Sequence, residues 1–203
     1  MDIQAALINV ALLWLLTTPH EFAHAWVATK LGDDTPRRDG RVTLNPLAHV
    51  DWIGTVLLPA VTSLVGAGFL GWGRPVNTNP SKLRGGFNGM ALVALAGPGS
   101  NVVFAVVLAA VAALTASANP SFANFAARGV RLSLYLALFN MIPVPPLDGS
   151  KLLLAARIPV QIYSMVARYG FLLLILLIGY TSVGITLSAW SVEAAGAMLG
   201  WFS

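Results

Sequence analysis

Three ionisable residues stand within five positions of an otherwise nearly uncharged apolar stretch. They are His20, Glu21 and His24, and the stretch runs from Ile3 to about Val27. Ionisable side chains inside a membrane-spanning helix are costly, so a cluster of three indicates a function. On a helix, His20 and His24 are one turn apart on the same face, which lets two imidazoles bind one metal ion. The stretch therefore predicts an apolar helix that carries a metal site.

The order of these residues is the H-E-x-x-H pattern, in which two histidines bind zinc and the glutamate serves as general base. Glu21 directly follows the first histidine, a position from which its carboxylate can reach a water on the metal. The alternative is that both histidines pack between helices and bond to backbone groups or water. The metal site is favoured, because an unpaired polar group in an apolar span costs several kcal/mol.

The composition of the 203-residue chain is that of an integral membrane protein, with 57% hydrophobic and 10% charged residues. Its mean hydropathy is +0.75, a value outside the range of soluble domains. We predict one membrane domain over residues 1–203, with a core at 1–150 and C-terminal helices at 151–203. The net charge of +4 is spread over the loops, which indicates lipid headgroups rather than nucleic acid as the partner. Because the chain has no cysteine, zinc ligands must be His, Asp or Glu.

Four apolar segments are predicted as membrane crossings: 3–31, 87–114, 130–142 and 169–187. A fifth segment, 52–71, is interrupted by proline and glycine and could either span or re-enter on the same side. Re-entry would place ten of the twelve lysines and arginines on one side of the membrane. The positive-inside rule favours that arrangement, with the N-terminus outside and the motif-bearing loops in the cytoplasm.

Residues 41–45 alternate in polarity and are predicted as a strand, and residues 74–77 could form a second short strand, which gives candidate edges near 42–44 and 76–78. They could offer an edge on which an extended peptide pairs its backbone. The predicted fold class is therefore an all-α polytopic membrane protein of about four transmembrane helices plus a re-entrant segment. A small β-hairpin or sheet is expected near the active site.

A hydrolytic zinc site uses three protein ligands and leaves one position open. The candidates for the third ligand are Asp148, His49 and Asp51. Asp148 follows an apolar helix and a proline-rich turn, and Gly149 would allow a close approach of the backbone. Asp148 could instead cap the helix expected to start at Ser150, while His49 and Asp51 are more typical of a structural turn. Spacing alone does not choose among the three candidates.

Two separated motifs in the expected order resemble those of the site-2 protease family of intramembrane zinc metalloproteases. That family combines H-E-x-x-H, found here at 20–24, with N-x-x-P-x-x-x-L-D-G, found here at 140–149. The A-G-P-G-S-N run at 96–101 resembles the start of the family's middle core helix. Residues 41–51 are similar to a segment of its compact prokaryotic branch. The resemblance covers about two-thirds of the chain, from roughly 14 to 150, and leaves no room for a PDZ or CBS domain.

The resemblance implies that His20, His24 and Asp148 bind one Zn²⁺ ion and that Glu21 is the catalytic carboxylate. Asn140 and Asn101 are the candidate substrate-binding residues, although a polar residue that bonds between helices is an equal alternative for Asn140. The implied partners are a transmembrane protein or peptide substrate and the lipid bilayer, with no nucleic acid. The implied location is a prokaryotic cell membrane, which the chain crosses several times.

The implied function is that of an intramembrane zinc-dependent endopeptidase that cleaves transmembrane segments of membrane proteins. Zinc would activate a water molecule, and Glu21 would act as its general base. The alternative is a metal or proton transporter whose intramembrane histidines line a pathway, although the other spans offer few polar residues for one. A non-catalytic membrane scaffold that retains a metal site is a further rival. The motifs carry no information on the physiological substrate or the oligomeric state.

Overall fold

Helices account for the regular structure of the protein. The computed structural model describes residues 3–64 and 71–202, and no β-strand occurs within those ranges. The α-helices are α1 (Ile3–Lys30), α2 (Thr35–Arg38), α3 (Leu58–Leu64), α4 (Phe87–Thr115), α5 (Pro120–Asn140), α6 (Asp148–Ala155), α7 (Val160–Arg168), α8 (Gly170–Tyr180) and α9 (Val183–Gly200). Three shorter helical turns are η1 (Pro46–His49), η2 (Trp52–Leu57) and η3 (Pro80–Lys82).

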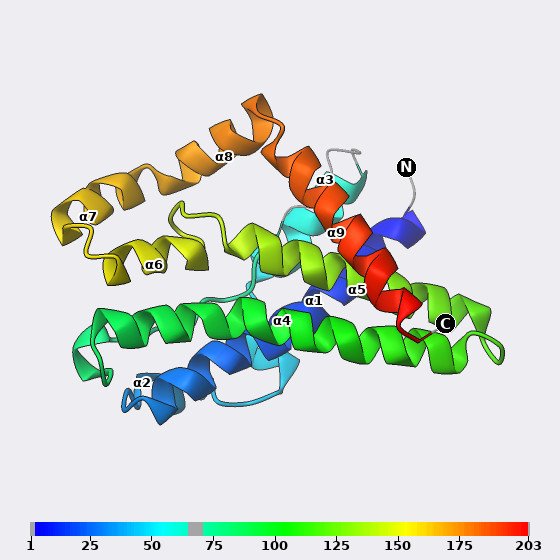
Figure 1. The fold of residues 1–203 in the computed structure, drawn as a ribbon, viewed down its shortest axis with the longest axis horizontal. Coiled ribbons are helices and arrows are strands. Elements are labelled where there is room, and N and C mark those ends of the chain that lie inside the picture. The colour runs from blue at the N-terminus through cyan, green and yellow to red at the C-terminus, as the bar shows by residue number, and fades with distance from the viewer. Residues whose placement is uncertain (1–2, 65–70, 203) are drawn as a thin grey trace.

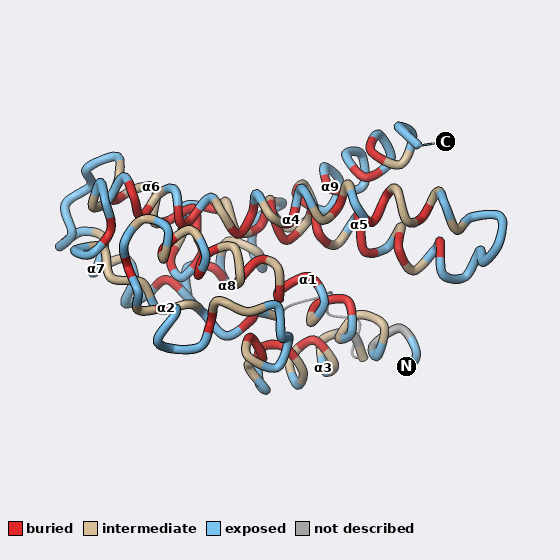
Figure 2. The backbone as a smooth tube through the Cα atoms, turned by 90° about the horizontal axis from the view of Figure 1, so that it is seen from below, coloured by how far each residue is buried: buried red, intermediate tan, exposed pale blue. Residues whose placement is uncertain are grey.

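The core lies where α1, α4, α5 and α9 pack against one another. Figure 1 shows α4 and α5 side by side, with α1 behind them and α9 crossing α5. The buried apolar cluster consists of Leu13, Leu16, Ala105, Leu108, Ala109, Val130, Leu134, Leu136, Ala195 and Met198. Ala105 and Ala109 of α4 are fully buried, and such small residues let membrane helices approach closely. In Figure 2 the buried positions of α4 and α5 follow the sides on which these helices meet.

A second apolar cluster joins the end of α5 and the turn after it to α8 and the start of α9. Phe139 and Ile142 contribute from α5 and the residues just after it, and Leu174 contributes from α8. Most other positions of α8 are exposed, so Leu174 is the main anchor of that helix. This cluster packs α8 and the start of α9 against the end of α5, while α6 itself contacts α4.

Two helices are long and apolar enough to cross a membrane. The most apolar windows of α4 and α9 have mean hydropathies of 2.0 and 1.2. The helices α7 and α8 pass the same test only as a pair, and that pair is bent by 64°. The prediction of about four transmembrane helices plus a re-entrant segment is therefore wrong for the described residues, which offer two candidate spans, or three with the bent pair.

Local signals shift the boundaries of two predicted crossings. The segment 130–142 is only the second half of α5, which begins at Pro120. Asn119 caps this start with its side chain, and proline is well suited to the first position of a helix. The segment 169–187 is divided at Thr181, whose extended backbone ends α8 before α9 begins. Apolar composition runs through that break, which is why composition did not reveal it.

The predicted β-hairpin or sheet is wrong for the described residues, because 42–44 and 76–78 both lack regular structure. A β-ladder needs free backbone donors and acceptors at alternating positions. The guanidinium of Arg41 donates hydrogen bonds to the carbonyl oxygens of Arg74 and Pro75. Pro75 also has no N–H to donate. These groups are therefore used by a side chain instead of by a second strand.

The segment 52–71 begins with η2 and α3, both of which pack against α1. Asp51 starts η2 by accepting hydrogen bonds from the N–H groups of Ile53 and Gly54. Residues 65–70, which include two of the glycines expected to break this segment, lie outside the described residues.

Candidate metal centre

His20 and His24 lie on one face of α1, with their Nε2 atoms 3.0 Å apart. The ring planes are nearly perpendicular, at 86°, and both residues are about 95% buried. The Nδ1–H of His24 donates to the carbonyl oxygen of Val93 on α4, at 2.7 Å. Such a bond fixes the ring orientation and leaves Nε2 as the free donor atom toward a metal.

Asp148 reaches the two histidines from the first turn of α6. Its Oδ2 lies 3.0 Å from Nε2 of His24 and 3.2 Å from Nε2 of His20. Ligand atoms of the three residues all lie within 4.8 Å of one another. The carboxylate thus faces the imidazoles, and the residue at the N-cap position of α6 is Leu147. The structure brings together the two histidines and the aspartate that the resemblance named, although 124 positions separate His24 from Asp148.

Two glycines make this meeting possible. A Cβ added to Gly97 of α4 would lie 2.3 Å from Nε2 of His24 and 2.6 Å from Nε2 of His20. The space beside both donor nitrogens is therefore kept open by the missing side chain. A Cβ on Gly149 would lie 2.2 Å from the carbonyl oxygen of Met141, so this glycine allows α6 to start close to the end of α5. Gly149 has the role that its position next to Asp148 predicted.

The donor set fits zinc. Two imidazole nitrogens and one carboxylate oxygen are ligands that zinc accepts in hydrolytic sites, which keep one further position open. The Nδ1 atom of His20 is buried and has no hydrogen-bond partner within residues 3–64 and 71–202. A protonated Nδ1 on that ring would leave its Nε2 free for a metal, as on His24. An apolar helical bundle with such a centre is typical of a membrane metalloprotein.

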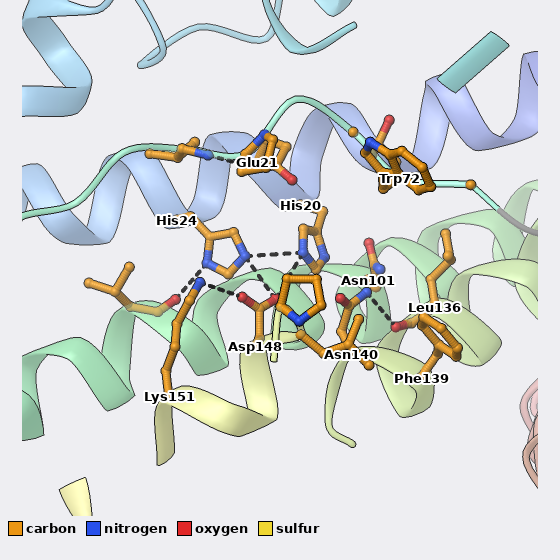
Figure 3. Close-up of a pocket in the computed structure, with 18 of the residues that line it drawn as sticks. His20, Glu21, His24, Trp72, Asn101, Leu136, Phe139, Asn140, Asp148 and Lys151 are labelled. Atoms are coloured by element: carbon orange, nitrogen blue, oxygen red, sulfur yellow. Dashed lines mark hydrogen bonds and ion pairs between the residues drawn. The ribbon is translucent and has the colours of Figure 1, made fainter. Parts of the chain in front are cut away.

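Glu21 lines the same cavity as the three metal-binding candidates. Its Oε2 accepts a hydrogen bond of 3.2 Å from the backbone N–H of Val76. Val76 belongs to residues 71–79, an irregular segment that passes over α1 and that we call the strap (Figure 3). Gly73 of the strap approaches so closely that an added Cβ would lie 3.4 Å from Oε1 of Glu21.

The strap is fixed by hydrogen bonds to the loop that precedes it. The N–H of Trp72 donates to Gly54, and the Thr55 hydroxyl donates to the carbonyl of Trp72. The buried guanidinium of Arg41 binds the carbonyl oxygens of Ala48, Arg74 and Pro75. A buried cation with all its bonds to backbone oxygens is a structural clamp, because it satisfies groups that water cannot reach.

His49 and Asp51, the other candidates for the third ligand, do not line the cavity. His49 is fully buried, and its Nε2 donates to the carbonyl of Thr43 at 2.8 Å. Burial lowers the pKa of His49, the bond to Thr43 opposes this effect, and the charge of Arg41 adds to it. Asp51 caps η2. Both residues therefore shape the loop that holds the strap.

Asn140 and Asn101 both line the cavity. The side-chain amide of Asn140 donates to the carbonyl of Leu136 in its own helix, at 2.9 Å. Asn101 is 99% buried, and neither its Oδ1 nor its Nδ2 has a partner among the described residues. An unpartnered buried amide in a cavity is available to a ligand. Asn101 thus has more free bonding capacity than Asn140.

The cavity has a volume of about 330 Å³ and is mostly apolar. One wall comes from Leu136 and Phe139 of α5 and another from Leu174 of α8. Trp72 and Phe171 pack edge to face across its rim, with ring centroids 6.3 Å apart. Sequence analysis missed these aromatic residues, together with Gly97 and Lys151. Lys151 follows Asp148 by one helical turn, a spacing that could have drawn attention to it.

Two curated relatives are similar to this chain. It is 37% identical over 171 residues to "Putative zinc metalloprotease YwhC" of Bacillus subtilis (strain 168), across 79% of this chain and 74% of the relative. It is 33% identical over 142 residues to "Putative zinc metalloprotease Rip2" of Mycolicibacterium smegmatis (strain ATCC 700084 / mc(2)155), across 67% of this chain and 52% of that relative. No family model and no solved structure matches. The chain belongs to the site-2 protease family of zinc metalloproteases.

Proposed function

We propose that this protein is an intramembrane zinc-dependent endopeptidase, embedded in a cell membrane that it crosses several times. The observation that carries this proposal is the meeting of three ligand atoms in one cavity, beside a carboxylate that is not among those three ligands. The two Nε2 atoms and Oδ2 of Asp148 lie 3.0 to 3.2 Å apart, and Glu21 lines the same cavity. The named relatives support zinc as the metal.

In this proposal His20, His24 and Asp148 hold one Zn²⁺ ion. The ion, when bound, supplies a Lewis acid for the scissile carbonyl and for water. Glu21 then accepts the proton of the attacking water and passes it to the leaving amine. The N–H of Val76 holds Oε2 of Glu21, so the carboxylate stays oriented and Oε1 is left for proton transfer.

The substrate in this proposal is a transmembrane segment of a membrane protein. Leu136, Phe139 and Leu174 give the cavity walls that suit the apolar side chains of such a segment. A peptide bond leaves its own helical hydrogen bonds when it enters the site, so its backbone groups need new partners. The free amide of Asn101 is placed to be one of them.

The test is cleavage of candidate transmembrane peptides by the purified, detergent-solubilised protein, with the cut located by mass spectrometry. Glu21→Gln keeps the size of the side chain but removes its basicity. We expect it to retain zinc and to lose about 10²–10⁴-fold in cleavage rate. Glu193→Gln is a matched control, since Glu193 is the other glutamate of the chain and lies exposed on α9.

Two results would oppose the proposal. A zinc-loaded wild-type protein that cuts no transmembrane peptide favours the transporter or the scaffold. Unchanged cleavage in Glu21→Gln would remove the assigned role of that carboxylate. If the wild-type protein cuts no peptide, metal or proton movement in vesicles would identify a transporter rather than a scaffold.

A further inference from the structure

Lys151 lies next to Asp148, on the opposite carboxylate oxygen from the two histidines. Its Nζ is 2.8 Å from Oδ1 of Asp148, whereas Oδ2 faces the imidazoles at 3.0 and 3.2 Å. Figure 3 shows Lys151 rising from α6 toward Asp148, with His20 and His24 above the carboxylate. The two oxygens of one carboxylate therefore have two separate kinds of partner.

The direction of the Lys151 side chain is informative. A lysine near an apolar region usually extends its long stem so that the ammonium reaches water. Lys151 instead turns toward the cavity, where it is the one cationic side chain among the described residues that line it. Its side chain is 28% exposed, and that of Asp148 is 7% exposed. Ion pairs between residues one turn apart contribute little when they are exposed, whereas this pair lies largely out of solvent.

A carboxylate can bind a metal ion through one oxygen or through both. A hydrolytic zinc site needs a free coordination position, and a second oxygen from the same carboxylate would compete for it. The ammonium of Lys151 occupies Oδ1, so Oδ2 is the oxygen that remains for the ion.

We propose that Lys151 is a positioning residue that keeps Asp148 bound to the ion through a single oxygen. This inference rests on the proposed metal centre. Lys151 acts on Asp148 as the carbonyl of Val93 acts on His24, since each binds an atom of the ligand other than the one that would bind the ion. Lys151 itself has no contact with the ion in this proposal.

Cobalt(II) in place of zinc tests the inference without any substrate. Four-coordinate cobalt absorbs visible light severalfold more strongly than five-coordinate cobalt, so the spectrum reports the number of ligands. Lys151→Met keeps the length of the stem and removes the ammonium, Lys151→Arg keeps the charge, and Lys82→Met is the matched control. The Lys82→Met substitution changes the net charge by the same amount, at an exposed position outside the cavity.

We expect Lys151→Met to bind cobalt with a severalfold weaker visible band, and Lys151→Arg and Lys82→Met to keep the wild-type band. An unchanged band in cobalt-loaded Lys151→Met would overturn the inference. So would loss of cobalt from this variant, because freeing Oδ1 leaves the ligand set intact. If Lys151→Met does not fold by circular dichroism, Lys151→Gln takes its place in the same comparison. A wild-type protein that binds cobalt but cuts no peptide refutes the proposed protease and not this inference, whereas failure of the wild type to bind cobalt refutes the metal centre itself.

Discussion

The helix α4 and the strap both contact the residues of the H-E-x-x-H motif, but they do so by opposite means. On α4, a regular helix, Gly97 leaves an opening beside the donor nitrogens of both histidines. The strap has no regular structure and offers Glu21 a backbone N–H from Val76. The helix therefore provides space for a metal ion, and the strap orients the carboxylate that would act beside it. In the proposed enzyme, metal binding and catalysis would therefore depend on separate elements, so changes in α4 and in the strap should have separable effects.

The largest effect is expected from Gly97→Ala. The added Cβ would lie 2.3 Å from Nε2 of His24, a distance at which either the ring or α4 must move. We expect loss of bound zinc, measured by elemental analysis, and with it loss of cleavage. Gly99→Ala is the matched control on the same helix, because nothing lies within 4 Å of its added Cβ. Full zinc content in Gly97→Ala would break the distinction between α4 and the strap.

Val76→Pro tests the strap directly, because it removes the backbone N–H that donates a hydrogen bond to Glu21. A hydrogen bond to a charged group contributes about 1.5–3 kcal/mol, so we expect cleavage to slow by about 10- to 100-fold. Zinc content should stay at the wild-type level. Val76→Ala keeps the N–H and serves as the control. Equal rates for the two variants would show that this hydrogen bond has no catalytic role.

Arg41→Met should weaken the attachment of the strap to the preceding loop. It leaves the carbonyl oxygens of Ala48, Arg74 and Pro75 without this partner, and a buried unsatisfied group costs about 1–3 kcal/mol. We expect a lower free energy of unfolding by chemical denaturation, and slower cleavage with zinc retained. Arg38→Met, at an exposed position nearby, should change neither quantity. Equal stability of the two variants would contradict the assignment of Arg41 as a clamp.

The smallest effect concerns how the stability of the folded protein depends on pH through His49, which lies in the loop that holds the strap. Burial lowers the pKa of His49 below its ordinary value of 6.5, so the folded protein binds this proton less readily than the unfolded chain does. Its contribution to stability is complete above about pH 6.5 and is lost as the pH falls through the lower folded-state pKa. We expect Tm to fall by a few degrees between pH 7.5 and 5, and to fall less in His49→Gln. An equal fall in both proteins would assign the pH dependence to other groups.

The metal-binding residues were more predictable from sequence than the conformation of the strap. The positions of His20 and His24 follow from helical spacing, which is local information. The pairing with Asp148 required the family resemblance, because spacing left His49 and Asp51 as equal candidates. Gly97 lies within a recognised run, but its contact with the histidines depends on how α4 packs against α1. Such a long-range contact has no local pattern.

The strap was mispredicted for a physical reason that concerns its partners. The alternating run 41–45 is typical of a strand and made 74–77 a candidate partner, but a strand also needs a neighbour with free backbone groups. Arg41, more than 30 positions away, takes two of the carbonyl oxygens instead. The break at Thr181 was missed because one extended residue can divide a run whose hydropathy does not change. The single-domain prediction for residues 1–203 stays a prediction.

The proposal that His20, His24 and Asp148 bind one zinc ion is tested by X-ray absorption at the zinc edge on purified protein, combined with zinc content per chain. We predict one zinc per chain, with two imidazole nitrogens and a carboxylate oxygen among its ligands. A variant with alanine at both His20 and His24 should lose the zinc. Protein that carries no zinc, or a zinc whose spectrum lacks imidazole ligands, would contradict the proposal.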